Sequence, residues 1–252
     1  MRIRASVAVV SGALALSALT VPAAQADGGY GDTTITKVVV DGDNKVSMGT
    51  SSPVTVKVSV TAKDNSGIKD ADEFALTGPG YGFELTRKPT CTVVNATTST
   101  CTASVTIDPR TDYYSNKNAG TWYVDAWINA NDDDFIQMDK AGSFFFQRAA
   151  KLTANAAPEP VKKGRTITVT GALTRANWET LKYGGYGSQS VKLQFRKKSA
   201  STYTTLKTIK ADTRGNLKTT TTATADGYYR FSFAGNSSTA AVNATGDLVD
   251  VQ

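Results

Sequence analysis

Residues 54–60 read Val-Thr-Val-Lys-Val-Ser-Val, with valine at every even position and a polar side chain at every odd position. This alternation with a period of two is typical of a β-strand that buries one face. Residues 121–128 (TWYVDAWI) and 191–195 (VKLQF) show the same alternation farther along the chain. Apolar residues with helical spacing are almost absent, so the sequence predicts an all-β fold.

The strand-like runs continue from residue 34 to residue 251 and are separated by Gly, Asn, Asp and Pro. Many short strands at this spacing indicate sandwiches or barrels. The stretch Pro158-Glu159-Pro160 favours a stiff, extended connector, so we place a domain boundary within residues 148–162. The sequence therefore predicts one domain over residues 27–150 and a second over residues 151–252.

The two predicted domains differ in charge, which the overall net charge of +6 conceals. Residues 27–150 hold 11 basic and 16 acidic side chains, whereas residues 151–252 hold 15 basic and 6 acidic ones. Such asymmetry indicates different partners for the two halves, or contact between them.

The first 26 residues have the layout of a secretory signal peptide. Arg2 and Arg4 precede an apolar run over residues 7–19, and Ala24-Gln25-Ala26 forms a small-x-small cleavage site. The apolar run is shorter than the ~20 residues that a membrane span needs. We expect cleavage after Ala26, no membrane span, and a secreted chain.

Two cysteines, Cys91 and Cys101, remain in the mature chain. Outside the cytoplasm an even pair indicates one disulfide, although two buried free thiols are the alternative. The sequence holds no histidine, so two cysteines cannot build an ordinary Cys/His zinc site.

The second half carries several motifs with turn glycines beside strand-like runs. They are Val161-Lys162-Lys163-Gly164, Val191-Lys192-Leu193-Gln194-Phe195-Arg196, Thr213-Arg214-Gly215 and Asp226-Gly227-Tyr228-Tyr229-Arg230. Together they resemble the immunoglobulin-like β-sandwich modules of exported Gram-positive bacterial proteins. This resemblance implies a spacer or adhesion role, and some exported proteins of this appearance are described as calcium-binding. It supports the fold far better than the function.

Catalytic chemistry has little support in this sequence. The absence of histidine excludes Ser-His-Asp and Cys-His catalysis. None of the four glutamates is paired with a second carboxylate as a glycosidase would require, and no glycine-rich phosphate loop opens a helix. We therefore expect a protein that is not an enzyme.

Clustered acidic residues form a candidate Ca²⁺ site. Asp132, Asp133 and Asp134 follow a predicted strand, and Ca²⁺ takes six to eight oxygen ligands. The candidate ligands are Asp132, Asp134 and Asp139, with Asp41 or Asp43 from a neighbouring loop. The alternative is a solvated hairpin tip, where Asp and Asn are common for turn geometry alone.

A long aromatic loop over residues 177–190 is the main candidate ligand surface. We expect Trp178, Tyr183 and Tyr186 to contact a ligand, because long loops are often functional. The alternative is that these aromatic side chains fold back onto the sandwich. Lys197 and Lys198 lie in a basic surface that would attract an anionic cell-wall polymer rather than nucleic acid, or would serve solubility and interdomain contact.

Trp127 stands beside Asp125 on the face opposite the predicted core residues of its strand. It could stack on a sugar ring or pack against another surface, such as the domain interface.

These observations predict an exported, monomeric, non-enzymatic protein of two tandem immunoglobulin-like β-sandwiches. We expect it to contact cell wall or another exported protein through its loops. Ca²⁺ binding near residues 132–139 is the alternative function.

Overall fold

The computed structural model describes residues 28–85, 87–112 and 115–252. Apart from one 3₁₀ turn, η1 (Asn116–Asn118), its regular elements are β-strands, which confirms the all-β prediction. The predicted signal peptide lies outside the described residues and stays a prediction. Within the described ranges, no helix is long and apolar enough to cross a membrane.

The first sandwich consists of two sheets. One sheet has the order β2-β4-β8-β7, and the other has the order β1-β10-β9-β5-β6 with β3 paired in parallel to β10. The strands are β1 (Gly28–Tyr30), β2 (Thr34–Val40), β3 (Lys45–Met48), β4 (Val54–Lys63), β5 (Ile68–Gly78), β6 (Tyr81–Glu84), β7 (Thr90–Asn95), β8 (Thr98–Ile107), β9 (Gly120–Ala130) and β10 (Phe135–Arg148).

The core of this sandwich follows the predicted alternation. Val56, Val58 and Val60 of β4 are fully buried, and Trp122 of β9 is the largest buried side chain opposite them. The Trp122 indole donates a hydrogen bond of 2.7 Å to the Asn118 carbonyl. A Cβ on Gly78 would lie 2.2 Å from this indole, so the strand needs glycine there for close approach.

The second sandwich also has two sheets. One contains β13 paired with β11, β12, β14 and β17, and the other has the order β16-β15-β18-β19 with β20 paired to β18. Its strands are β11 (Ala150–Leu152), β12 (Asn155–Ala157), β13 (Thr166–Asn177), β14 (Lys182–Gly185), β15 (Ser190–Lys197), β16 (Thr204–Lys210), β17 (Asn216–Thr222), β18 (Gly227–Phe233), β19 (Val242–Asn243) and β20 (Asp247–Val249).

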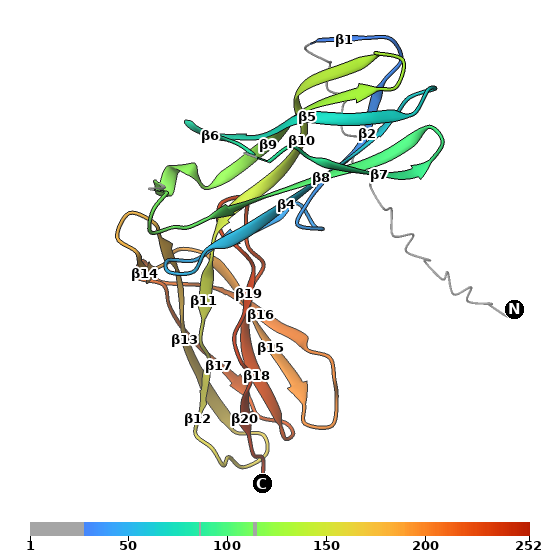
Figure 1. Ribbon diagram of the computed structural model, residues 1–252. Helices are drawn as coiled ribbons and strands as arrows, with labels where there is room; N and C mark the ends of the chain where they lie inside the picture. The colour runs from blue at the N-terminus through green and yellow to red at the C-terminus, as the bar shows by residue number, and fades with distance from the viewer. Residues whose placement is uncertain (1–27, 86, 113–114) are drawn as a thin grey trace, which may run out of the picture.

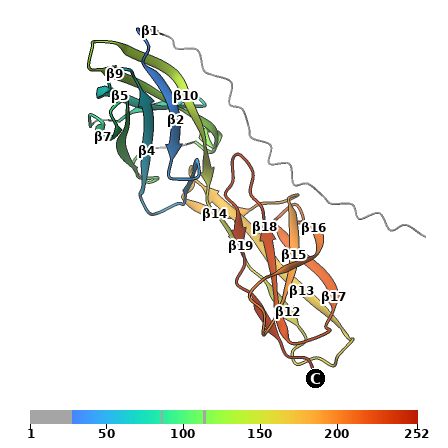
Figure 2. The same cartoon turned by 90° about the vertical axis from the view of Figure 1, so that its right-hand side faces the viewer.

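The chain passes directly from one sandwich to the other. Strand β10 ends at Arg148 and β11 begins at Ala150, and both views show the two sandwiches stacked end to end (Figure 1, Figure 2). The prediction that Pro158 and Pro160 form the connector is wrong, because both prolines lie between β12 and β13 of the second sandwich. The residue at the junction, Ala149, is held by backbone hydrogen bonds instead.

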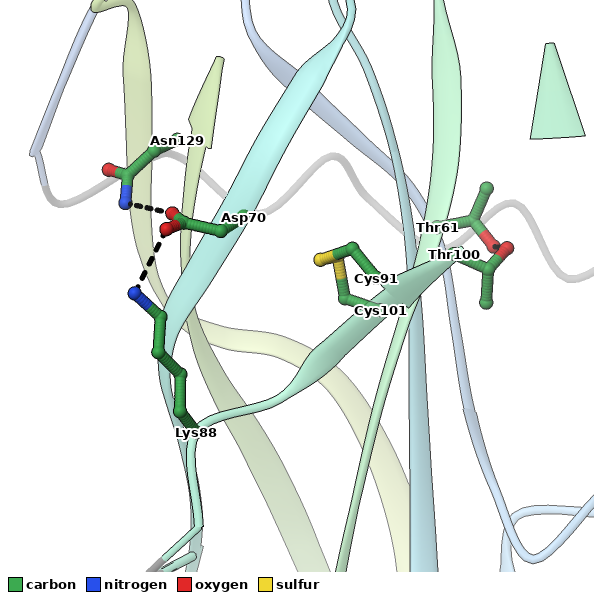
Figure 3. The surroundings of a disulfide bond; sticks show 7 residues. All are labelled: Thr61, Asp70, Lys88, Cys91, Thr100, Cys101 and Asn129. Carbon is green, nitrogen blue, oxygen red and sulfur yellow. Dashed lines mark hydrogen bonds and ion pairs between the residues drawn. A yellow bond between two sulfur atoms is a disulfide. The ribbon is translucent and has the colours of Figure 1, made fainter. Parts of the chain in front are cut away.

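The predicted disulfide between Cys91 and Cys101 is formed. It joins directly opposed residues of β7 and β8, so it ties an edge strand to its sheet (Figure 3). Nearby, the Lys88 ammonium contacts the carboxylates of Asp70 at 2.9 Å and Asp72 at 3.2 Å. The start of β7 is therefore fastened both to β8 and across to β5.

Candidate functional site

Trp178 lies inside the molecule rather than on a ligand-contacting loop. Its side chain is 3% exposed and belongs to the core of the first sandwich, although Trp178 directly follows β13 of the second sandwich. The indole Nε1 donates to the Met48 carbonyl at 3.1 Å, and the ring centroid lies 5.1 Å from that of Phe146. This corrects the expectation of an exposed Trp178, because burial of its large apolar ring fills the junction between the sandwiches.

Tyr183 packs against the core of the first sandwich, whereas Tyr186 packs against the core of its own, second sandwich. The Lys151 ammonium lies 4.0 Å from the Tyr183 ring centroid, and burial raises the pKa of the Tyr183 phenol. The Tyr186 hydroxyl accepts a hydrogen bond of 2.8 Å from Asn236, and the Arg175 guanidinium lies 3.9 Å over its ring. Both tyrosines are engaged by neighbouring side chains, so the loop folds back as the alternative interpretation stated.

Polar contacts hold the same junction. The Glu179 carboxylate accepts hydrogen bonds from the Ser115 hydroxyl at 2.9 Å and from the backbone N–H of Asn116 at 3.1 Å. These bonds lower the pKa of the Glu179 carboxyl group. The buried Arg148 donates through Nε to the Ala176 carbonyl at 2.5 Å. Residues 177–186 therefore join the two sandwiches instead of presenting a binding loop.

The structure brings together three carboxylates at one end of the first sandwich. Asp32, Asp64 and Asp134 each offer an oxygen, and these oxygens lie within 4.8 Å of one another. They come from three different loops, before β2, after β4 and before β10. Gly31 has φ +82°, and a Cβ there would meet the Asp134 carboxylate, so glycine is required beside the cluster. We call these three residues the acidic tip.

The predicted ligand set is divided by the fold. Of the predicted ligands, only Asp134 belongs to the acidic tip. The exposed Asp132 carboxylate instead accepts a hydrogen bond of 3.4 Å from the backbone amide of Asp134. Asp41 and Asp43 lie beyond the end of β2 that is farther from the acidic tip. Because β2 has seven residues at ~3.3 Å each, its length separates them from the tip by about 20 Å. There they accept hydrogen bonds from the backbone amides of Lys57 and Lys45 in a turn.

Asp139 lies on the outer face of β10, where it lines a separate pocket. The sequence interpretation missed Asp32 and Asp64 as partners of Asp134. The available signal was that Asp32 precedes β2 and Asp64 follows β4, because antiparallel pairing of Thr34 with Lys63 places those positions together.

Asp64 is the buried member of the acidic tip. Its side chain is 1% exposed and accepts hydrogen bonds from the Thr33 hydroxyl at 2.7 Å and from the Ser66 hydroxyl at 2.6 Å and amide at 2.8 Å. Burial raises the pKa of the Asp64 carboxyl, but the hydrogen bonds from Ser66 and Thr33 outweigh it, so the pKa is lowered overall.

We expect Asp64→Asn to make stability less dependent on acid. Because the folded-state pKa of Asp64 lies below its unfolded value, its contribution is present above the unfolded pKa and lost as the pH falls through the folded pKa. Thermal unfolding between roughly pH 2 and pH 6 measures this, with the unfolded Asp value near 3.9 as reference. An equally steep acid loss in wild type and variant would contradict the assignment.

Lys197 and Lys198 are exposed at the end of β15, beside an ordered group of arginines and tyrosines. The Arg230 guanidinium lies 3.8 Å over the Tyr203 ring, and Arg196 lies 4.3 Å over Tyr228 and 5.2 Å over Tyr203. Arg230 also donates to Gln194 at 2.9 Å.

We call this surface of β15, β18 and the turn before β16 the basic-aromatic face. It is defined by Lys192, Gln194, Arg196, Lys197, Lys198, Tyr203, Tyr228 and Arg230. Within the described part of the chain, neither Arg196 nor Arg230 forms a salt bridge. The sequence interpretation missed Arg230 and Tyr203, although Tyr228 and Arg230 alternate with buried Tyr229 and so share the outer face.

Comparisons with known proteins do not assign a family. No protein-family model and no curated protein sequence matches the chain. The predicted resemblance to exported Gram-positive modules therefore has no sequence match behind it, whereas the β-sandwich part of that prediction rests on the strand pairings above.

Several solved structures are distantly similar. A DUF4785 family protein from Legionella pneumophila matches 77% of this chain and 50% of its own at 14% identity and a TM-score of 0.38. The Yersinia pseudotuberculosis adhesin InvE matches 86% of this chain and 58% of its own at 13% identity and a TM-score of 0.29. The D0-D1 domain of intimin matches 86% of this chain and 98% of its own at 14% identity and a TM-score of 0.28. These values are too low to support a functional argument.

Proposed function

We propose that this chain is a secreted, non-enzymatic binding protein that attaches to an anionic cell-wall polymer through the basic-aromatic face. The observation that carries this proposal is the stacking of Arg196 and Arg230 on tyrosine rings, with no carboxylate partner for either guanidinium among the residues that the structure describes. The disulfide and the predicted signal peptide support a place outside the cytoplasm.

The chemistry of the face suits repeated anionic groups. A guanidinium stacked on an aromatic ring can still donate from its edge to phosphate or carboxylate. Arg196 uses one Nη1–H for the Ala200 carbonyl and Arg230 uses its Nε–H for Gln194, so the other N–H groups of each side chain are the donors for the polymer. The stacking also restricts the arginine side chain, so less conformational entropy is lost on binding. Lys192 adds positive charge along β15, and the exposed Lys197 and Lys198 add it at the end of the strand, so an extended polymer can meet several cations at once.

We expect Arg196→Gln/Arg230→Gln to weaken binding of polyglycerol phosphate about tenfold, the effect of ~1.4 kcal/mol. Lys162→Gln/Lys163→Gln removes the same charge from an exposed loop outside the face and serves as the matched control. Isothermal titration at low salt measures both variants against wild type. Equal weakening by both pairs of substitutions would show that binding depends on the net charge and not on the basic-aromatic face, which would contradict the proposal. Absence of wild-type binding would also refute it.

We propose Ca²⁺ binding at the acidic tip as a second function, because three carboxylates from three loops converge there. Close like charges repel each other, and a cation that takes oxygen ligands relieves that repulsion. The donor set therefore fits Ca²⁺, with Asp32, Asp64 and Asp134 as the residues that would hold it.

Calcium at about 100 times its dissociation constant is expected to stabilise the protein by ~2.7 kcal/mol. Calorimetry in Ca²⁺ and in chelator measures the shift in melting temperature. Asp134→Asn should abolish the shift, whereas Asp132→Asn, at an exposed neighbour outside the cluster, should preserve it. A melting temperature that is unchanged at millimolar Ca²⁺ would exclude this function.

A further inference from the structure

Strand β7 lies at an edge of the sheet β2-β4-β8-β7, and none of its residues is charged. The uncharged stretch includes the whole β7–β8 hairpin, because residues 89–107 contain no Lys, Arg, Asp or Glu. Other edge strands of similar length do contain lysine, namely Lys37 in β2, Lys207 and Lys210 in β16, and Lys218 in β17. Charged side chains protect an exposed edge from pairing with another strand, and β7 lacks that protection.

The side chains of β7 are open to solvent. Val93 is 71% exposed and Val94 is 62% exposed, and Thr90 and Thr92 beside them are exposed as well. The disulfide of Cys91 nevertheless fastens the strand to β8 (Figure 3). The edge is therefore both accessible and held in an extended conformation that another strand can join.

The register of the hairpin shows which backbone groups point away from β8. Opposed residues of an antiparallel pair alternate between hydrogen-bonded pairs, with Cα atoms about 5.5 Å apart, and non-hydrogen-bonded pairs at about 4.5 Å. The Cα atoms of Cys91 and Cys101 are 3.8 Å apart, which identifies a non-hydrogen-bonded pair. Thr90 and Thr92 therefore bond to β8, whereas the N–H and C=O groups of Cys91 and Val93 point to the free edge. Among the residues that the structure describes, no backbone group outside the hairpin bonds to them.

We propose that β7 pairs with β7 of a second copy of this chain, antiparallel and about a two-fold axis at Thr92. In this register Cys91 of each copy lies opposite Val93 of the other. The outward N–H and C=O groups of these residues face each other, so each pair exchanges both of its hydrogen bonds. The exposed Val93 side chain of each copy also meets the disulfide of the other. The two four-stranded sheets thereby become one continuous sheet.

The absence of charge favours a second copy over a strand of another protein. A second β7 brings no like charge and no unpaired charge to the contact, whereas a charged strand would place its charges opposite uncharged side chains. The contact is also self-complementary, because each copy supplies the same exposed valine and the same disulfide. A two-fold interface between identical chains requires this property.

The geometry of β7 limits the assembly to two copies. The register shift after Val93 ends the regular part of the strand, so pairing is confined to residues 90–93. A two-fold contact uses the free β7 edge of both copies, so it cannot propagate into a fibre. The proposal replaces the monomer predicted from the sequence, in which the edge position of β7 is not visible. It does not depend on polymer binding, because the basic-aromatic face belongs to the second sandwich.

Sedimentation equilibrium and amide hydrogen exchange on the oxidised mature chain test the proposal without any substitution. The contact is small, so we expect a reversible dimer that forms as the concentration rises from roughly 10 µM to 1 mM. The amides of Cys91 and Val93 should exchange more slowly at the higher concentration, because only the dimer bonds them. The amide of Thr92, which already bonds to β8, should change less. A monomer at every concentration, or a dimer without this protection, overturns the proposal.

Two substitutions locate the contact. Val93→Lys places a charge on the free edge and should weaken dimerisation about tenfold. Because Val93 is exposed, its variant should melt as wild type does at low concentration. Leu206→Lys adds the same charge at a side chain of edge strand β16 that is 43% exposed, so this matched control should dimerise as wild type does. Unchanged dimerisation of Val93→Lys, or equal weakening by both variants, contradicts pairing through β7.

Discussion

Replacing Trp178 with alanine is expected to lower the free energy of unfolding by about 3–5 kcal/mol, the range for truncation of a fully buried aromatic side chain. The indole is 3% exposed and packs with Phe146, and its N–H is bonded to the Met48 carbonyl. The variant loses this packing, leaves a cavity, and exposes an unpaired carbonyl. The substitution destabilises the junction in particular, because the segment that carries Trp178 belongs to the second sandwich and the residues that Trp178 contacts belong to the first.

Calorimetry of the mature chain measures this change. Wild type should unfold in one transition, because the two sandwiches share a buried indole and the hydrogen bonds of Glu179. Trp178→Ala should separate the transitions and lower the first of them. Leu181→Ala, at a neighbouring side chain that is 40% exposed, serves as the control and should change stability little. An unchanged single transition in Trp178→Ala would contradict the junction described above.

Loss of the disulfide is expected to cost roughly 2–3 kcal/mol, because the bond closes a short loop in the unfolded chain. Cys91 and Cys101 are separated by 10 residues. Strand β7 is an edge strand with exposed Val93 and Val94, so it buries little surface of its own that would hold it to β8. We therefore expect β7 to be the element that loosens first when the bond is broken.

Chemical denaturation of oxidised protein, reduced protein and Cys91→Ala/Cys101→Ala measures this cost. Alanine avoids placing a hydroxyl in the core at position 101, which is fully buried. Reduced wild type and the double variant should have similarly lowered midpoints. Identical midpoints for oxidised and reduced protein would show that the hairpin and the Lys88 contacts hold β7 without the bond (Figure 3).

The strands were predictable because apolar and polar residues alternate along a strand that buries one face. The valines of residues 54–60 lie on the core face of β4 as their spacing indicates, and the outward-facing Trp127 follows from the same rule. The disulfide was predictable because the chain offers only one pair of cysteines.

The segment that joins the two sandwiches could not be predicted from the residues of that segment alone. Proline at positions 158 and 160 indicates an extended segment, but nothing in that signal says whether the segment joins two domains or crosses the end of one. In the same way, the sequence identified residues 177–190 as an aromatic loop without indicating which sandwich it packs against. That choice depends on contacts such as Trp178 with Met48, which are 130 positions apart.

The site residues depend on register between distant segments. Asp32 meets Asp134 across 102 positions of sequence, and the fold separates Asp41 and Asp43 from them by the length of β2. Arg230 joins Arg196 because β18 pairs with β15 in a register that places Gln194 opposite Arg230. Neither pairing can be obtained from spacing along the chain alone.

The most direct test of the polymer-binding proposal is an NMR titration of the isotope-labelled mature chain with polyglycerol phosphate. We predict that the largest chemical-shift changes fall on the outer face of β15 and β18, around Arg196 and Arg230, and that they fade as salt is added. Shifts confined to the Lys162–Lys163 loop, or centred on the first sandwich, would contradict the account.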